Sequence, residues 1–261
     1  MKEFLFSEKF RLTFLIAVCG SLWLLESIMP LFNYSKQRWR RAVPNMALTA
    51  ILLSMNLVLS FASAAAAALA MQKQIGLLYW SALPLWSETL LGIAGLDLFA
   101  YFAHVLLHKS AFGWQFHRVH HSEPEVDVTT AFRQHPGETV WRIGWQLAAI
   151  VIFGVSLWVV IIYLMLSALN AQLEHANLNV PDKLDRLLRL FIVTPNMHKV
   201  HHSRAQIETD SNYANIFSIW DKLFGTYTPA KNLHELRYGL DGFDEPTKQS
   251  LPGLLKIPFI K

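Results

Sequence analysis

Long apolar runs limit the folds that this chain can adopt. Residues 12–32 contain Glu26 as their only charged residue, and residues 48–71 contain none. A run of about 20 apolar residues is long enough to cross the hydrocarbon core of a bilayer as a helix. Helices suit that medium because they satisfy their own backbone hydrogen bonds. The sequence therefore predicts an all-α, polytopic membrane protein.

Composition supports this class and excludes others. Hydrophobic residues make up 53% of the chain and charged residues only 16%, against about 25% in soluble domains. The single cysteine, Cys19, excludes an internal disulfide and any site built from several thiolates. A net charge of +4 without a long Lys/Arg stripe suits loops at an anionic membrane surface better than a nucleic-acid groove.

Two further apolar segments bring the expected total to about four transmembrane or half-spanning helical segments. Residues 75–107 fit one long or broken span or two short ones, with Pro84 and Gly92 to Gly95 as candidate breaks. Residues 141–169 carry Gly154 in their middle. Histidine-rich motifs flank this segment, so we expect a helical hairpin that enters the membrane and returns.

Charge asymmetry predicts the orientation and the domain division. The loop expected at residues 33–45 carries Arg38, Arg40 and Arg41 but no acidic residue, so the positive-inside rule places it in the cytoplasm. If the histidine motifs share one site, they face the cytoplasm too. We expect N-terminal transmembrane helices in residues 1–75. Residues 76–261 then form a second domain of membrane helices and a polar, helical cytoplasmic cap.

Histidines are the second unusual feature of the chain, because eight of the eleven fall into three short boxes. The boxes are H-x-x-x-H at His104 and His108, H-x-x-H-H at His117, His120 and His121, and the same pattern at His198, His201 and His202. Residues spaced i, i+3 and i+4 project from one side of a helix. Neutral imidazole is the commonest metal-binding side chain and suits iron, copper and zinc.

Eight imidazoles are too many for one tetrahedral zinc ion, which takes four ligands. Two metal ions of four to six coordination would use them. His175, at the end of the expected hairpin, is a ninth candidate. Zinc in place of iron, a histidine-lined membrane metal transporter and a catalytically inactive metal-bound scaffold remain alternatives at this point.

The motifs around these boxes resemble the fatty acid hydroxylase / sterol desaturase superfamily of membrane histidine-box di-iron oxygenases. The segments that carry the resemblance are, in order, DLFAYFAHVLLH, FHRVHHS, TTAFRQHPGE, EHANL, TPNMHKVHHS and NYANIFSIWDKLFGTY. They extend over roughly residues 90–259. Val105 is a departure, since many members have arginine directly after the first histidine.

The resemblance implies a membrane-bound, non-haem di-iron oxidoreductase that uses O2 to hydroxylate a C–H bond of a lipid, either fatty acyl, sterol-like or related. A desaturase or sterol-type oxidase of the same family is the alternative. Implied cofactors are two iron ions, with O2 as co-substrate. Implied partners are a bilayer lipid and a separate electron donor of the cytochrome b5 or ferredoxin type. The implied metal ligands are His104, His108, His117, His120, His121, His175, His198, His201 and His202.

Metal-bound histidines usually donate their second N–H group to an acceptor behind them. Asp97 lies seven residues before His104 and so falls on the same helix face, and Glu174 directly precedes His175. Two more carboxylates, Asp210 and Asp221, follow the last box. We expect some of these four carboxylates to orient imidazoles.

Overall fold

The computed structural model describes residues 7–34 and 38–260, and helices form almost all of the regular structure there. Two isolated β-bridges are the only extended pairings among the described residues. The all-α prediction is therefore confirmed. In chain order the elements are α2 (Glu8–Ile28), α3 (Arg38–Lys73), η1 (Leu77–Trp80), α4 (Leu85–Lys109), α5 (Ala111–His121), η2 (Val128–Phe132), α6 (Pro136–Phe153), α7 (Leu157–His175), α8 (Asp182–Leu188), α9 (Pro195–His201), α10 (Gln206–Thr209), α11 (Ile219–Leu223), η3 (Leu233–Glu235), α12 (Leu251–Lys256) and η4 (Ile257–Phe259).

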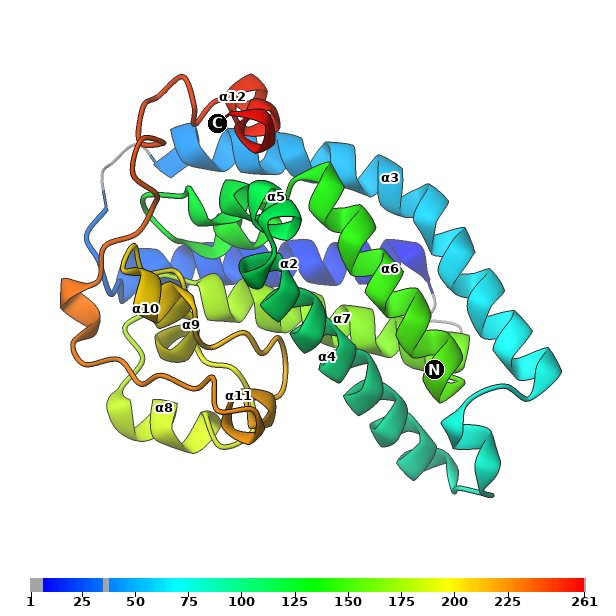
Figure 1. The fold of residues 1–261 in the computed structure, drawn as a ribbon. Coiled ribbons are helices and arrows are strands. Elements are labelled where there is room, and N and C mark those ends of the chain that lie inside the picture. The colour runs from blue at the N-terminus through cyan, green and yellow to red at the C-terminus, as the bar shows by residue number, and fades with distance from the viewer. Residues whose placement is uncertain (1–6, 35–37, 261) are drawn as a thin grey trace.

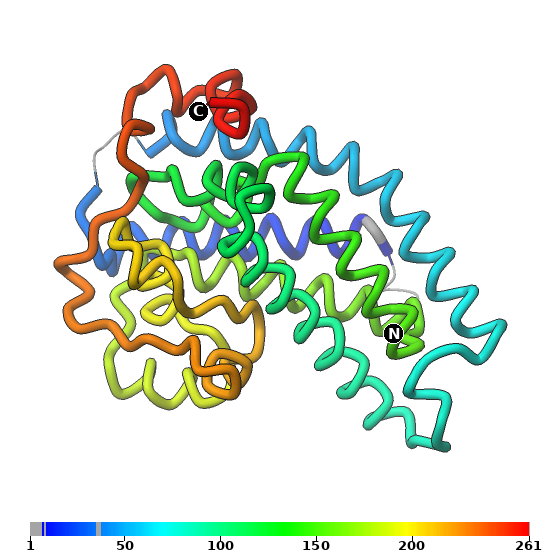
Figure 2. Tube along the Cα trace, viewed as in Figure 1, coloured from blue at the N-terminus to red at the C-terminus, as the bar shows by residue number. Residues whose placement is uncertain are grey.

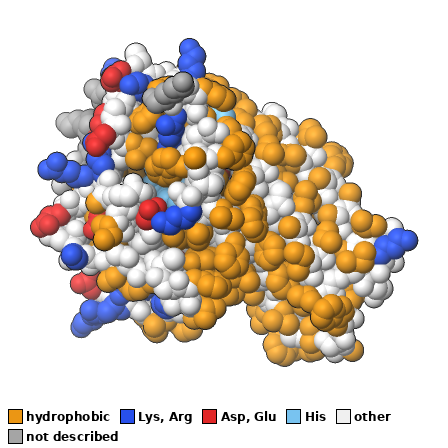
Figure 3. Space-filling model, in the orientation of Figure 1, with side chains coloured by type: hydrophobic (Ala, Val, Ile, Leu, Met, Phe, Trp, Pro, Cys, Tyr) orange, Lys and Arg blue, Asp and Glu red, His pale blue; other side chains and the backbone are white. Residues whose placement is uncertain are grey.

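Four of these helices, α2, α3, α4 and α7, are long and apolar enough to cross a membrane. Their outer surfaces expose large apolar side chains, such as Phe61 on α3 and Trp86 on α4. Hydrophobic side chains cover the bundle on the right of Figure 3, whereas charged side chains gather at the opposite end. An apolar girdle of this kind is stable in lipid, so the chain is an integral membrane protein.

Helix α3 begins earlier than the sequence predicted. Arg38, Arg40 and Arg41 form its first turn and not a loop, and Pro44 lies inside the helix. Residues 35–37 of the expected loop lie outside the described part of the chain. The prediction was wrong because tertiary ion pairs of Arg38 and Arg41 with acidic groups of the core stabilise this turn, and no local pattern shows them.

The expected break at Pro84 is confirmed, since α4 begins directly after it. Gly95, by contrast, lies inside α4, where an added Cβ atom would come within 2.7 Å of the Phe153 ring on α6. This glycine permits close helix packing and does not break the helix. The expected turn at Gly154 is confirmed, since it joins α6 to α7 in a left-handed conformation with φ 73°. A hairpin that enters the membrane and returns stays a prediction.

The helical bundle of α2, α3, α4, α6 and α7 leads into a cap of short helices (Figure 1). Its core contains Ile93 and Leu96 of α4, Ile150 of α6, and Val159 and Tyr163 of α7. The tube in Figure 2 shows the C-terminal segment returning beside the start of α3. The histidine boxes lie where the bundle meets the cap.

Candidate metal centre

Four helices end at the histidine-rich centre. Each of α4, α5, α7 and α9 has a ligand candidate within its last two residues. Two of them are short and begin with a capping side chain: Ser110 Oγ accepts a hydrogen bond from Gly113 N, and Thr194 Oγ1 accepts one from Met197 N. The C-terminal end of a helix carries partial negative charge and favours a cation. The backbone therefore adds to the attraction for metal ions here.

All nine predicted histidines come together, and all nine side chains are buried. They form two groups, in each of which one nitrogen per residue lies within 4.8 Å of all the others. The five-histidine group consists of His104, His108, His117, His121 and His201. The four-histidine group consists of His120, His175, His198 and His202.

The two H-x-x-H-H boxes divide between the groups in opposite ways. On α5, His117 and His121 join the five-histidine group while His120 joins the other. On α9 the outer pair of the box joins the four-histidine group and the i+3 residue, His201, joins the first. Positions i and i+4 are about 40° apart around a helix, and i+3 lies about 100° from i+4. One box can therefore face two ions.

The spacing of the nitrogen atoms fits metal ligation. His104 Nε2 lies 3.0 Å from His117 Nε2, and His175 Nε2 lies 3.0 Å from His120 Nε2 and 3.1 Å from His198 Nε2. Two nitrogen ligands at right angles, each about 2.1 Å from one ion, are about 3.0 Å apart. A neutral imidazole has a single N–H group, so hydrogen bonds alone cannot satisfy these contacts.

Buried nitrogen atoms without a hydrogen-bond partner also indicate metal binding. His201 Nε2 and both ring nitrogens of His108 are buried without a hydrogen-bond partner. Leaving such atoms unpaired costs free energy, and a bound cation removes that cost. The donor set, two clusters of convergent imidazoles, suits two ions of iron, copper or zinc.

Backbone carbonyl groups hold several rings with the Nε2 atom inward. The Nδ1–carbonyl distances are 2.8 Å for His104 to Tyr213, 2.7 Å for His201 to Ser211, 3.2 Å for His120 to Arg133 and 2.6 Å for His175 to Ala171. Each carbonyl accepts a hydrogen bond from the Nδ1–H group, which leaves the Nε2 lone pair free for a metal ion.

Burial keeps the imidazoles outside the membrane helices neutral. It is the main cause that lowers the pKa of His201 to about 4, with the charge of Arg142 among the lesser causes. The same burial, followed by neighbouring histidines, holds the pKa of His117 and His202 well below the ordinary value. Neutral imidazole is the form that binds metal, so these groups need not lose a proton first.

Two of the four expected carboxylates lie beside histidines. Asp210 Oδ1 is 3.6 Å from His108 Nδ1, and Glu174 Oε1 is 3.8 Å from His198 Nε2 and 3.9 Å from His175 Nδ1. Asp210 lies on the outer side of the His108 ring, where it can accept a hydrogen bond from Nδ1. Glu174 lies near the inner nitrogen of His198, on the side that would face an ion.

The other two carboxylates contact no imidazole. Asp97 accepts hydrogen bonds from Ile216 N, Phe217 N and Trp220 Nε1, and Asp221 accepts them from Tyr213 N and Ala214 N. Both therefore fix the segment that presents the Ser211 and Tyr213 carbonyl groups to histidines. They act on the centre through this segment.

Sequence reasoning missed Glu138, which is fully buried beside the five-histidine group. Its Oε1 atom lies 3.1 Å from His117 Nδ1 and accepts a hydrogen bond of 2.7 Å from Arg142 Nε. A Glu–Arg pair at i, i+4 inside an otherwise apolar helix is the sequence signal that would have found it.

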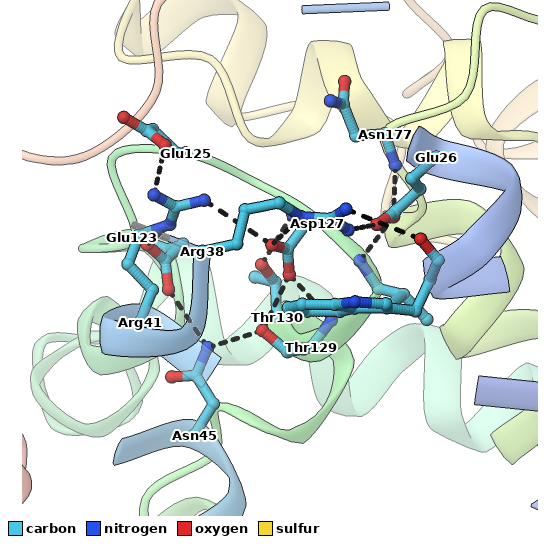
Figure 4. Close-up of polar contacts among 12 residues, drawn as sticks. Glu26, Arg38, Arg41, Asn45, Glu123, Glu125, Asp127, Thr129, Thr130 and Asn177 are labelled. Carbon is cyan, nitrogen blue, oxygen red and sulfur yellow. Dashed lines mark hydrogen bonds and ion pairs between the residues drawn. The ribbon is translucent and has the colours of Figure 1, made fainter. Parts of the chain in front are cut away.

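A buried polar network supports the centre from behind (Figure 4). Glu26 of α2 pairs with Arg38 of α3, and its Oε1 accepts hydrogen bonds from Val128 N at 2.8 Å and Asn177 N at 2.7 Å. Asn177 follows His175 by two residues. The N-terminal helices thus anchor the chain segment that leads out of the four-histidine group.

The same network continues through Asn45 of α3. Its amide donates to Glu123 Oε2 and Thr129 Oγ1, both at 3.1 Å, and its oxygen accepts from Arg133 Nη1 at 3.2 Å. Arg133 is buried, and its carbonyl group contacts His120. The buried charges are paired, as their desolvation requires.

A cavity of about 390 Å³ lies inside the bundle beside the histidines. One side is lined by Ala103, the neighbour of His104, and by Ala171, whose carbonyl contacts His175. Further lining residues are Leu52 of α3, Leu96 of α4 and Thr139 of α6. The cavity therefore lies within the helical bundle, next to residues that adjoin two of the histidines.

The chain was then compared with known proteins. The sequence pattern described as fatty acid hydroxylase matches residues 89–226, more than half of the 261 residues. The chain belongs to the fatty acid hydroxylase family. The matched segment contains all nine histidines together with Glu138. No solved structure matches the chain.

The curated relatives of this chain have the names of lipid-modifying enzymes. Alkylglycerol monooxygenase of Xenopus tropicalis is 32% identical over 62% of this chain and 34% of its own length. Ornithine lipid hydroxylase OlsE of Rhizobium tropici is 31% identical over 55% of this chain and 43% of its own. Methylsterol monooxygenase 1 of Gallus gallus is 29% identical over 56% and 49%. The alignments thus span a third to a half of each relative.

Proposed function

We propose that this protein is a membrane-bound, O2-dependent di-iron hydroxylase that acts on a C–H bond of a lipid. The observation that carries the proposal is the division of nine buried histidines into two ligand groups at the end of a membrane bundle. Family membership supports iron as the metal, and the names of the relatives support a lipid as the substrate.

The five-histidine group would hold one iron ion and the four-histidine group the other. Bound iron supplies the activation of O2 that an unreactive C–H bond requires. The chain holds the imidazoles neutral and aimed inward, through the backbone carbonyls and through Glu138 behind His117. Burial of every imidazole keeps water away from the reacting groups.

The cavity in the bundle is the proposed substrate site. Its helices, α3, α4 and α7, are membrane helices, so an apolar tail can enter without leaving an apolar medium. We further propose that residues 76–261 form the catalytic domain and that the centre faces the cytoplasm. A separate carrier of the cytochrome b5 or ferredoxin type would deliver electrons to it.

Lipid mass spectrometry under 18O2 tests the proposal. Cells that express the wild-type chain are compared with cells that express His120→Ala, and we expect a lipid 18 mass units heavier only with the wild type. A product two mass units lighter would instead show desaturation. Wild-type protein that carries iron but changes no lipid would contradict the proposed activity.

A further inference from the structure

One wall of the cavity has polar groups that the protein leaves without partners. Thr139 is buried, and its Oγ1 atom makes no hydrogen bond. Arg142 lies one turn further along α6 and uses its Nε atom to bind Glu138. In the part of the chain that the structure describes, the two terminal nitrogens of Arg142 make no hydrogen bond. Both residues line the cavity.

Other polar groups of the cavity wall are half-buried, and two of them are already hydrogen-bonded within the protein. Gln146 donates to Ser63 Oγ at 3.0 Å, and Asn215 donates to Ser167 Oγ at 2.9 Å. Asn56 also lines the cavity but is exposed. Thr139 Oγ1 is buried without a partner, which costs free energy. The Arg142 side chain beside it is 28% exposed, so its terminal nitrogens can also turn to a ligand atom in the cavity.

This pair lies at the histidine end of the cavity. Glu138 connects them, since it binds Arg142 and lies 3.1 Å from His117 Nδ1. Residues 163–171 of α7 line the cavity over about 12 Å of helix, from Ala171 near the histidines to Tyr163 further away.

We infer that the substrate is an amphiphilic lipid whose oxygen acceptor binds Thr139 and Arg142, with its apolar tail in the cavity. The carbon that is oxidised then lies close to this oxygen and not in the middle of a chain. The inference rests on the proposed function, because it assigns the substrate class of that site. Hydroxyl, ether and carbonyl oxygens all accept hydrogen bonds from a guanidinium group.

Binding of two matched probes tests this recognition. Decanol and undecane have the same number of heavy atoms, but only decanol has an oxygen. Native mass spectrometry of the purified full-length chain in detergent gives the Kd of each probe. We expect wild type to bind decanol about tenfold more tightly than undecane. In Arg142→Gln, decanol should bind almost as weakly as undecane. In Thr139→Val, decanol should bind about threefold more weakly than in wild type, and undecane binding should be unchanged in both variants.

Arg189→Gln is the matched control. Arg189 also pairs with a carboxylate four residues away, Asp185, but it lies outside the cavity. Thr139→Val keeps the shape of the side chain and leaves the Arg142–Glu138 pair intact, so it remains informative if Arg142→Gln does not fold. Equal binding of the two probes to wild type, or decanol binding unaffected by Thr139→Val and by any folded Arg142→Gln protein, would overturn the inference.

The readout separates this inference from the proposed activity. Probe binding requires no turnover, whereas the 18O experiment measures turnover. If no lipid acquires 18O but decanol binding follows the expected pattern, the hydroxylase proposal fails and recognition of an oxygen-bearing amphiphile stands. If 18O is incorporated but the probes bind equally, only the recognition by Thr139 and Arg142 is wrong.

Discussion

The two histidine groups have similar ligands but different surroundings. The five-histidine group has carboxylates behind its rings, with Glu138 at His117 and Asp210 at His108. In the four-histidine group, the nearby carboxylate is Glu174, which lies 3.9 Å from His175 Nδ1 and 3.8 Å from the inner nitrogen of His198. Both groups have two rings held by backbone carbonyls and other Nδ1 atoms without a hydrogen bond. A carboxylate behind an imidazole strengthens the ligand. We therefore expect the five-histidine group to bind its ion more tightly.

Glu174 adds to this difference. Its Oε1 atom is 3.8 Å from His198 Nε2, the inner nitrogen, and its Oε2 atom accepts a hydrogen bond from Asn170 at 3.0 Å. With one imidazole fewer, an ion held by the four-histidine group would have room for a carboxylate or a small molecule as a further ligand. We therefore expect tight structural binding in the five-histidine group and open coordination in the four-histidine group.

Removing one ligand from each group should have the largest effect. We expect His121→Ala and His202→Ala each to lower iron from two ions per chain to about one and to abolish lipid hydroxylation. Elemental analysis of purified protein measures the first effect and 18O incorporation the second. His234→Ala is the control, because this exposed histidine belongs to neither group. Full activity in either ligand variant would show that its histidine does not bind the metal.

Glu138→Gln should affect one group only. Loss of the carboxylate behind a metal-bound histidine typically lowers metal affinity 10–100-fold, and Glu138 contacts His117 of the five-histidine group. A competitive chelator titration measures the affinity of each ion. Glu125→Gln, a half-buried carboxylate that pairs with Arg41 away from the centre, is the control. Equal weakening of both ions would refute the assignment of Glu138 to one group.

Glu26→Ala should act mainly on the four-histidine group. Glu26 is buried, pairs with Arg38 and accepts hydrogen bonds from the buried Val128 N and Asn177 N, the latter near His175. Its loss leaves both backbone N–H groups without an acceptor. The free energy of unfolding should fall by about 3 kcal/mol, against about 0.5 kcal/mol for Glu125→Ala, which is more exposed. Chemical denaturation in detergent measures both, and an equal loss in the two variants would contradict this account.

Asp210→Asn should have the smallest effect. Asp210 lies 3.6 Å from His108 Nδ1, is 25% exposed and also pairs with Lys109. We expect the affinity of the five-histidine group to fall by about threefold, since solvent screens this contact. The chelator titration used for Glu138→Gln detects it. A loss as large as that of Glu138→Gln would mean that exposure does not weaken this interaction.

The sequence alone predicted the helical membrane fold, the break at Pro84, the turn at Gly154 and the gathering of nine histidines. Each depends on a local pattern: the length of an apolar run, a proline or glycine within it, or histidines spaced by 3 and 4 residues. The division of each H-x-x-H-H box depends on how α5 and α9 are turned toward each other, which spacing does not contain. The early start of α3 depends on partners distant in sequence, so no local pattern revealed it. The i, i+4 pair of Glu138 with Arg142 was a local signal, but the contact of Glu138 with His117 on another helix was not.

Iron analysis of the wild-type chain tests the central claim most directly. Protein purified without chelator and reconstituted with Fe(II) should contain two iron ions, and a chelator should remove them in two steps, the four-histidine ion first. Mössbauer spectroscopy should show two distinct iron environments in the wild type and only one of them in His202→Ala. A single tightly bound ion, or two ions that leave in one step with identical spectra, would contradict the division of the nine histidines into two unlike sites.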